Sequence, residues 1–222
     1  MATQLDLQEQ EQLDTLKVFW RQYGNLITWT LTLCLAAFAG WSGWQWYQRD
    51  QAVKAGAMFD EVDRAVQAAE VDKAARLFAE LKQRYGSTTF TPQAALGLAR
   101  LQLDKGKADD AKASLKWVAE SAKEPEYQAA AQLRLAGIAL DEKKFDDALK
   151  ALDAVKAPTF DALVADRRGD VLLAQGKRAE ALAAYQAAYK GMDEKVEYRR
   201  LIEAKLTSLG AAPDKPAAEA RP

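Results

Sequence analysis

Two pairs of neighbouring carboxylates are the residues of this chain best suited to acid–base or metal chemistry: Asp109-Asp110 and Asp146-Asp147. Paired carboxylates can act as general acid and general base, or they can hold a metal ion. Both pairs fall where helices are expected to start, and acidic side chains there interact favourably with the helix dipole. Capping and charge compensation therefore explain them. We expect no catalytic residue, no cofactor and no metal site.

Other groups that carry enzyme chemistry are absent or poorly placed. The sequence has no histidine, which removes imidazole bases, Ser-His and Cys-His nucleophile systems, and histidine metal ligands. Its one cysteine, Cys34, lies in an apolar run, where a thiol is poorly reactive. The adhesive tripeptide Arg-Gly-Asp occurs at 168–170, but inside an expected packed helix in which Gly169 allows close approach. The net charge of -1 gives no electrostatic case for nucleic acid.

An uncharged stretch organises the N-terminal part of the chain. Residues 22–48 lie between Arg21 and Arg49 and contain no charged side chain. About 27 residues form a helix of about 40 Å, and ~20 apolar residues are enough to cross a hydrocarbon core of about 30 Å. Aromatic residues gather at its ends, as at membrane interfaces: Trp20, Tyr23 and Trp29, then Trp41, Trp44, Trp46 and Tyr47. The stretch predicts a transmembrane helix.

Two alternatives to this interpretation are a buried helix of a soluble protein and a cleaved signal peptide. Residues 37–39 (Ala-Phe-Ala) fit a cleavage pattern, but the segment before the apolar run is long and acidic, not short and basic. In an uncleaved anchor, Ala36 with Gly40 and Ala39 with Gly43 form small-residue pairs that allow close helix packing. We expect this face to contact another membrane helix.

The remainder of the chain contains a repeated pattern. Its aligned alanines, spaced about 36, 37 and 33 residues apart, are Ala75, Ala111, Ala148 and Ala181. The tetratricopeptide period is about 34 residues. In the last three units a small residue precedes the alanine by twelve positions: Ala99, Ala136 and Gly169. A large apolar residue follows it by four: Leu115, Leu152 and Tyr185. Small residues let paired helices approach closely, and the large residue fills the gap beside them.

The first unit fits this pattern less well. Asp63 occupies the place of its small residue, so we predict a degenerate cap or no true repeat there. Met58, Val62 and Val66 form one narrow apolar stripe, which we expect to pack on the following domain. The alternative is that it packs on another protein.

The expected fold class is all-α: an N-terminal transmembrane helix followed by a tetratricopeptide-like α-solenoid. In the part after the anchor leucine and alanine dominate and β-branched residues are sparse, a composition that favours helices. The predicted helix pairs are 92–105 with 108–122, 127–142 with 145–155, and 160–175 with 178–190. A closing helix at about 194–208 would cover the last pair with Tyr198, Leu201, Ile202, Lys205 and Leu209. The predicted parts are a tail (1–21), the anchor (22–48), a connecting helix and degenerate repeat (49–90), the repeat domain (91–210) and a disordered Pro/Ala tail (211–222).

Stacked units of this kind present a face lined by their first helices, where an extended segment or a helix of a partner can bind. From the spacing, the candidates are Leu96, Arg100, Leu103 and Asp104, then Leu133, Leu140 and Asp141, then Asp166, Asp170 and Leu173. The alternative is an ordinary solvated face.

The order of parts resembles the YfgM-like family, the ancillary subunits of the bacterial SecYEG translocon. One stretch that carries the resemblance is Glu-Gln-Leu-Asp-Thr-Leu-Lys-Val-Phe-Trp at 11–20, with Tyr23-Gly24. The other is Leu-Asp-Ala-Val-Lys at 152–156, followed by Val-Ala-Asp-Arg-Arg-Gly-Asp at 164–170 and Leu-Leu-Ala-Gln-Gly-Lys at 172–177.

The resemblance implies a single-pass inner-membrane protein with its N-terminus in the cytoplasm and its repeat domain in the periplasm. Basic residues flank the anchor almost evenly, so charge alone does not give this orientation. The resemblance also implies association with the SecYEG translocon and with PpiD, a membrane-anchored periplasmic chaperone of the prolyl-isomerase type. An emerging secretory polypeptide is a further expected partner.

We therefore hypothesise an interaction protein that assists protein transfer and folding beside the translocon. One rival is a tetratricopeptide scaffold of another envelope assembly or stress-signalling complex, whose complexes would lack translocon subunits. Another is an envelope hydrolase that uses the paired carboxylates, which alanine substitution of all four would test.

Overall fold

A computed structural model describes residues 7–212 of the chain, and the side-chain surroundings from residue 11 onwards. The chain divides into two units, residues 1–51 and 52–222. The helices are α1 (Leu7–Gln67), α2 (Val71–Tyr85), α3 (Phe90–Asp104), α4 (Ala108–Ser121), α5 (Pro125–Asp141), α6 (Phe145–Asp153), α7 (Asp161–Ala174), α8 (Arg178–Gly191) and α9 (Tyr198–Ser208), with a 3-10 turn, η1 (Pro158–Phe160). The described residues contain no strand, which confirms the all-α prediction. Of the predicted disordered tail (211–222), residues 213–222 lie outside the described residues.

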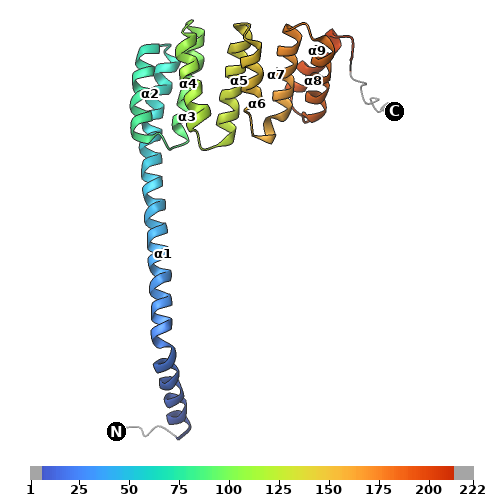
Figure 1. Ribbon diagram of the computed structural model, residues 1–222. Helices are drawn as coiled ribbons and strands as arrows, with labels where there is room; N and C mark the ends of the chain where they lie inside the picture. Colours follow the sequence, from blue (N-terminus) through green and yellow to red (C-terminus); the bar gives the residue numbers. More distant parts are fainter. Residues whose placement is uncertain (1–6, 213–222) are drawn as a thin grey trace, which may run out of the picture. The chain divides into compact units, whose positions relative to one another are not determined.

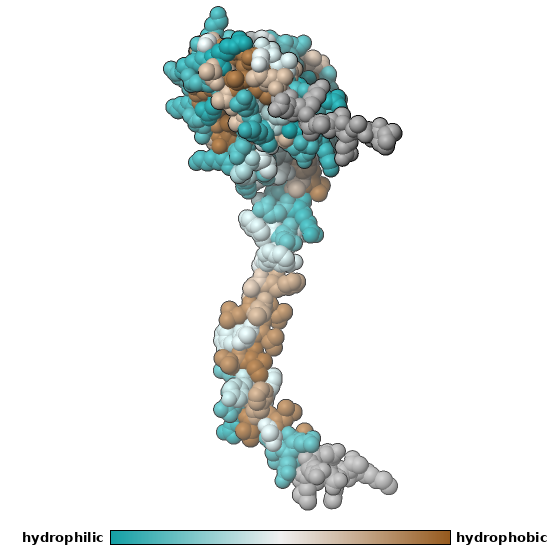
Figure 2. Space-filling model, turned by 90° about the vertical axis from the view of Figure 1, so that its right-hand side faces the viewer, coloured by the Kyte–Doolittle hydropathy of each residue, from teal (hydrophilic) through white to brown (hydrophobic). Residues whose placement is uncertain are grey.

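The first unit consists of the N-terminal part of α1. Among the described residues, α1 is the one helix long and apolar enough, by length and composition, to cross a membrane, and its most apolar window has a mean hydropathy of 1.4. Figure 2 shows this window as a hydrophobic band along the helix, bordered by hydrophilic surface. The hydroxyls of Thr28, Thr30 and Thr32 donate to backbone carbonyls four residues earlier at 2.8 Å. The helix thus satisfies these polar groups internally, as a segment in lipid must.

The second unit is a row of helix pairs joined by tight turns (Figure 1). Helices α3 and α4, α5 and α6, and α7 and α8 form the three predicted pairs, with bounds within about two residues of those expected. The last turns of α1 share a core with α2 through Ala55, Val62 and Ala65. Met58 and Val66 pack partly buried against the same core, which confirms that the apolar stripe of this segment packs on the following helices.

All four turns between paired helices have one backbone geometry. A residue with positive φ occupies the same position in each: Ala69 (58°), Gly106 (73°), Lys143 (59°) and Gly176 (78°). The N–H of the next residue then donates to the carbonyl five positions earlier at 2.7–3.0 Å, as in Glu70 to Ala65 and Lys144 to Ala139. This is the Schellman arrangement that satisfies the last carbonyls of a helix.

This shared turn corrects the register of the first repeat. Ala74, not Ala75, stands five residues after the positive-φ position, and it is fully buried like its counterparts in the other units. Twelve positions before it lies Val62, which is 1% exposed, so the prediction that Asp63 takes this place is wrong by one residue. Two successive alanines made the sequence alignment ambiguous, and only the turn shows which one faces the core. Phe78 supplies the large residue, but Val62 is not a small residue, so the first repeat is degenerate, which is one of the two predicted alternatives.

The closing helix α9 begins later than predicted but covers the last pair. Ile202 and Leu206 are buried against α8, and Leu209 packs beside them. Leu201, predicted to cover the pair, is 47% exposed. It lies at the edge of the face that α9 turns inward, because one residue advances a helix by about 100°.

Lys143→Gly is expected to raise the free energy of unfolding by about 0.5–1 kcal/mol, because a residue with a Cβ is strained at positive φ and glycine is not. The matched change Gly106→Ala, at the same position of another turn, should lower it by about 1 kcal/mol. Urea unfolding of the full-length protein in detergent, followed by circular dichroism, measures both. Equal stability of the two variants and wild type would contradict the role of this turn.

Candidate partner-binding faces

The face of α1 predicted to meet another membrane helix is open within the first unit. Ala36 is exposed, and a methyl group built on Gly40 or on Gly43 would meet no atom within 4 Å. Close approach of a second helix at these small residues is therefore not obstructed by side chains of the chain itself. Contact with a partner at this face stays a prediction.

The second candidate is the first-helix face, formed by the exposed or half-buried side of α3, α5 and α7. Leu103 is 36% exposed and Leu173 is 39% exposed, whereas Leu133 and Leu140 are half-buried and Leu96 is buried. Arg100, Asp104 and Asp141 are exposed. The predicted residues thus give α3 and α5 an apolar surface with charges beside it.

Arg134 belongs to this face but was not among the predicted residues. It reaches from α5 to α3, where its Nη1 donates to the backbone carbonyl of Leu96 at 3.0 Å. Partial burial, together with the nearby positive charge of Arg100, lowers the pKa of the Arg134 guanidinium. The repeat pattern assigned Leu133 to the face and gave no signal for its neighbour.

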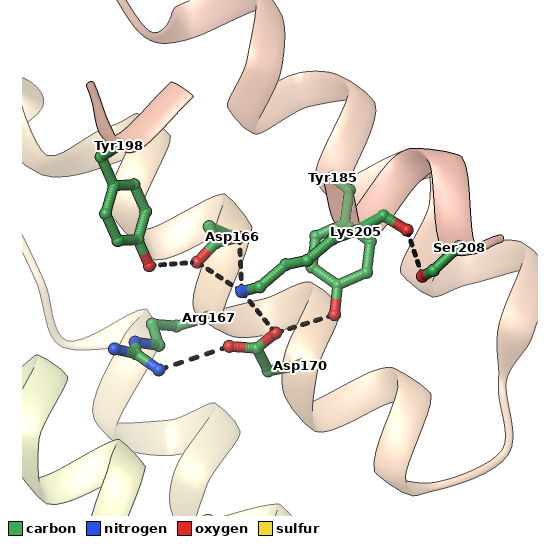
Figure 3. Close-up of polar contacts among 7 residues, drawn as sticks. All are labelled: Asp166, Arg167, Asp170, Tyr185, Tyr198, Lys205 and Ser208. Atoms are coloured by element: carbon green, nitrogen blue, oxygen red, sulfur yellow. Dashed lines mark hydrogen bonds and ion pairs between the residues drawn. The ribbon is translucent and has the colours of Figure 1, made fainter. Parts of the chain in front are cut away.

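Asp166 and Asp170, predicted on the same face, lie in a polar network that joins α7 to α8 and α9 (Figure 3). Lys205 of α9 stands at its centre: its Nζ donates to both carboxylate oxygens of Asp166 at 2.8 and 2.9 Å and to Oδ1 of Asp170 at 2.7 Å. The hydroxyl of Tyr198 donates to Asp166 at 2.8 Å, and that of Tyr185 donates to Asp170 at 2.8 Å.

This network encloses Asp166 completely. The residue is 0% exposed, and its carboxylate accepts three hydrogen bonds from α9. Asp170 keeps a side-chain exposure of 18%. A partner therefore reaches Asp166 only if α9 leaves its place, whereas Asp170 and the exposed Leu173 remain at the surface.

The phenol of Tyr198 is expected to lose its proton at an unusually high pH. Burial, and then its hydrogen bond to Asp166, raises the pKa of the phenol from 10.0 to about 12. Because the folded state holds the neutral phenol, this stabilisation is complete below pH 10 and is lost as the pH rises towards 12. The difference between the tyrosinate absorbance titrations of wild type and Tyr198→Phe isolates this group. A difference curve centred at or below pH 10 would contradict the buried bond.

The tripeptide at 168–170 has a structural role. A Cβ built on Gly169 would lie 2.5 Å from Cε1 of Tyr185, so only glycine fits between α7 and α8 there. Arg168 pairs with Asp153 at 2.6 Å, and Asp170 belongs to the network above. The prediction that Gly169 serves close packing is confirmed.

The paired carboxylates lie where they were predicted, in the first turns of α4 and α6. Asp109 pairs with Lys112 at 2.7 Å. No group of three or more potential ligands that could hold a metal ion occurs among residues 11–212, whose side chains the structure describes.

A hollow of about 570 Å³ lies elsewhere, between α4, α5 and α6, and no sequence pattern predicted it. Among the residues that line the hollow, Glu142 accepts bonds from Lys112 and Lys144, each at 2.8 Å. These bonds lower the pKa of the Glu142 carboxyl to about 2. Its remaining charged lining residues are two lysines and two acids, Lys116, Lys150, Glu120 and Asp147. Together with Lys112, Lys144 and Glu142 they give the lining four lysines and three acids, a net charge of +1. Lys112 also pairs with Asp109, which does not line the hollow.

The helix pairs, their common turn and the packing of small against large residues define a repeat protein of the tetratricopeptide type. The family described as tetratricopeptide repeat-like domain matches residues 17–211. The chain is 34% identical to the ancillary SecYEG translocon subunit of Neisseria gonorrhoeae over 91% of its own length and 98% of the relative's. It is 30% identical to the protein of that name from Escherichia coli over 90% and 96% of the two lengths, and 26% identical to that of Haemophilus influenzae over 82% and 89%. The chain belongs to the family of ancillary SecYEG translocon subunits, as the sequence resemblance indicated.

Proposed function

We propose that this protein is a membrane-anchored interaction protein that associates with the SecYEG translocon and with a PpiD-like periplasmic chaperone, and that it assists the transfer and folding of secretory proteins. The observation that carries the proposal is similarity over nearly the full length of both chains to a relative named as an ancillary translocon subunit. The apolar helix and the translocon-associated name together fit an inner-membrane protein.

In this proposal the protein acts by binding, without catalysing a reaction. The anchor crosses the inner membrane once, with the N-terminus in the cytoplasm and the repeat unit in the periplasm. Tethering a binding unit beside its partners raises their effective concentration without new contacts. The first-helix face, with Leu103 and Leu140 at its surface, is the proposed site for the chaperone or for an emerging polypeptide.

The test is purification of the tagged full-length protein from its own membranes in mild detergent, followed by mass spectrometry of what remains bound. Translocon subunits together with a periplasmic chaperone support the proposal. A different envelope complex would overturn it in favour of the scaffold alternative, and the fold would be unaffected. Protease protection of the repeat unit in spheroplasts and in inverted vesicles tests the orientation separately.

Gly40→Ile with Gly43→Ile is expected to reduce co-purification of membrane partners severalfold, because the added side chains keep a second helix away from the small-residue face. A matched control is Cys34→Ile, which adds bulk about 120° and about 180° around the helix from the two glycines and should leave co-purification unchanged. Unchanged recovery with the glycine variant would remove this face from the interface.

A further inference from the structure

We infer that Arg100 and Arg134 form a recognition site on the first-helix face for an acidic, leucine-containing extended segment of a partner polypeptide. The inference rests on the proposed function only in requiring that the repeat unit bind a polypeptide. It adds the chemistry of what is bound and the two residues that select it.

The side chain of Arg134 reaches the helix that carries Arg100. The Arg134 guanidinium crosses from α5 to the carbonyl of Leu96 on α3, at 3.0 Å. Leu96 stands one helical turn before Arg100. The lowered pKa of Arg134 agrees with this placement, since Arg100 contributes to it through its charge.

Neither arginine has an acidic partner among residues 11–212. Arg134 bonds a neutral carbonyl, and Arg100 takes part in no ion pair or hydrogen bond with another side chain there. At the other end of the same face, by contrast, Asp166 and Asp170 are compensated by Lys205. Two neighbouring cations repel each other and favour a bound anion, most strongly where water is partly excluded.

The surroundings point to a polypeptide and not to a small anion. Leu103 is exposed one turn after Arg100, and Leu133 is half-buried beside Arg134. Methyl groups built on Gly97 or Gly137 would meet no atom within 4 Å, so the surface beside both arginines is open to a backbone. A segment that alternates carboxylates with leucine-like side chains satisfies both the cations and the apolar surface.

The first-helix face also carries two exposed acids, Asp104 and Asp141, but neither bonds Arg100 or Arg134. The hollow between α4, α5 and α6 has a separate set of charged residues. Lys116 and Lys150 line that hollow, but Glu120 and Asp147 balance them. The pair Lys116→Gln with Lys150→Gln therefore removes the same charge as Arg100→Gln with Arg134→Gln without touching the proposed site. It is the matched control.

The experiment measures fluorescence anisotropy of a labelled synthetic peptide that alternates leucine and glutamate, with the full-length protein in lipid nanodiscs and empty nanodiscs subtracted. Two matched peptides carry glutamine or lysine in place of glutamate. We expect the glutamate peptide to bind most tightly, to weaken with salt, and to lose about tenfold or more in affinity for the double arginine variant. The lysine-to-glutamine control should change affinity by less than about twofold.

Equal binding of the three peptides, or equal binding to wild type and the double arginine variant, would overturn the inference. Arg100→Gln alone guards against misfolding, because Arg100 is exposed and its loss should leave the melting curve unchanged while weakening the glutamate peptide. Co-purification separates the two proposals. If translocon subunits are recovered but the peptides bind equally, the proposed function stands and the inference is wrong. If the glutamate peptide binds selectively but no translocon subunit is recovered, the inference stands and the proposed function is wrong.

Discussion

Lys205→Met is expected to destabilise the repeat unit by about 3–5 kcal/mol, the cost of leaving a buried charge without its partner. Asp166 is 0% exposed, and Lys205 bonds both of its oxygens at 2.8 and 2.9 Å and Asp170 at 2.7 Å. Methionine keeps the length of the side chain but leaves two carboxylates facing each other. Thermal and urea unfolding of the full-length protein in detergent measure the loss, and amide exchange should show α9 opening first.

The control is Lys107→Met. Lys107 and Asp72 also stand 2.8 Å apart and also join two helical segments, but their side chains are 42% and 87% exposed. An exposed pair contributes about 0–1 kcal/mol, so this variant should be nearly as stable as wild type. The double variant Asp166→Asn with Lys205→Met should be less destabilised than the sum of its single changes, because the unpaired charge is gone. Similar losses at Lys205 and Lys107 would refute the importance of burial.

The helices and their pairing could be predicted because the determinants are local. Small and large residues that recur at fixed positions specify which helix faces pack. Each turn lies within a few residues of the buried alanine of its repeat. The one register error arose in the first repeat, where Ala74 and Ala75 fit the pattern equally. The positive φ of Ala69, a residue without the signal that glycine gives, was the missing information.

The sequence predicted that Tyr198 and Lys205 face the last helix pair, but it did not predict their bonds to Asp166 and Asp170, because these partners lie far apart in the sequence. Tyr198 and Lys205 stand 32 and 39 residues after Asp166, and the repeat pattern describes only contacts within and between neighbouring units. In the preceding units the position of Asp166 holds Leu96 and Leu133. An acid in place of leucine is itself a signal, since a carboxylate at a packed position requires a partner.

Arg134 was missed for a related reason. The pattern counts positions on an idealised first helix and assigns Leu133 to the face, so a long side chain at the next position was not considered. An arginine reaches beyond its own position, because its aliphatic part can lie along apolar surface while the guanidinium bonds elsewhere. Contact with the carbonyl of Leu96 depends on the spacing of α3 and α5, which the sequence does not state.

Gly169→Ala is expected to lower the free energy of unfolding by about 1–3 kcal/mol, the usual effect of overpacking a core. The new methyl carbon would lie 2.5 and 2.6 Å from two carbons of the Tyr185 ring, and this ring is itself buried and fixed by its bond to Asp170. The second and third repeats accommodate alanine here because they place leucine opposite, as Ala99 with Leu115 shows.

That comparison supplies the decisive control. Tyr185→Leu alone removes a buried ring and its hydrogen bond, so it should also be destabilising. Combined with Gly169→Ala it recreates the alanine–leucine pair of the second and third repeats, and the alanine no longer meets a ring. The double variant should therefore be more stable than Tyr185→Leu, so that the same alanine substitution changes sign with its neighbour. Additive losses in urea unfolding would show that Gly169 is required for its backbone and not for the space that it leaves to Tyr185.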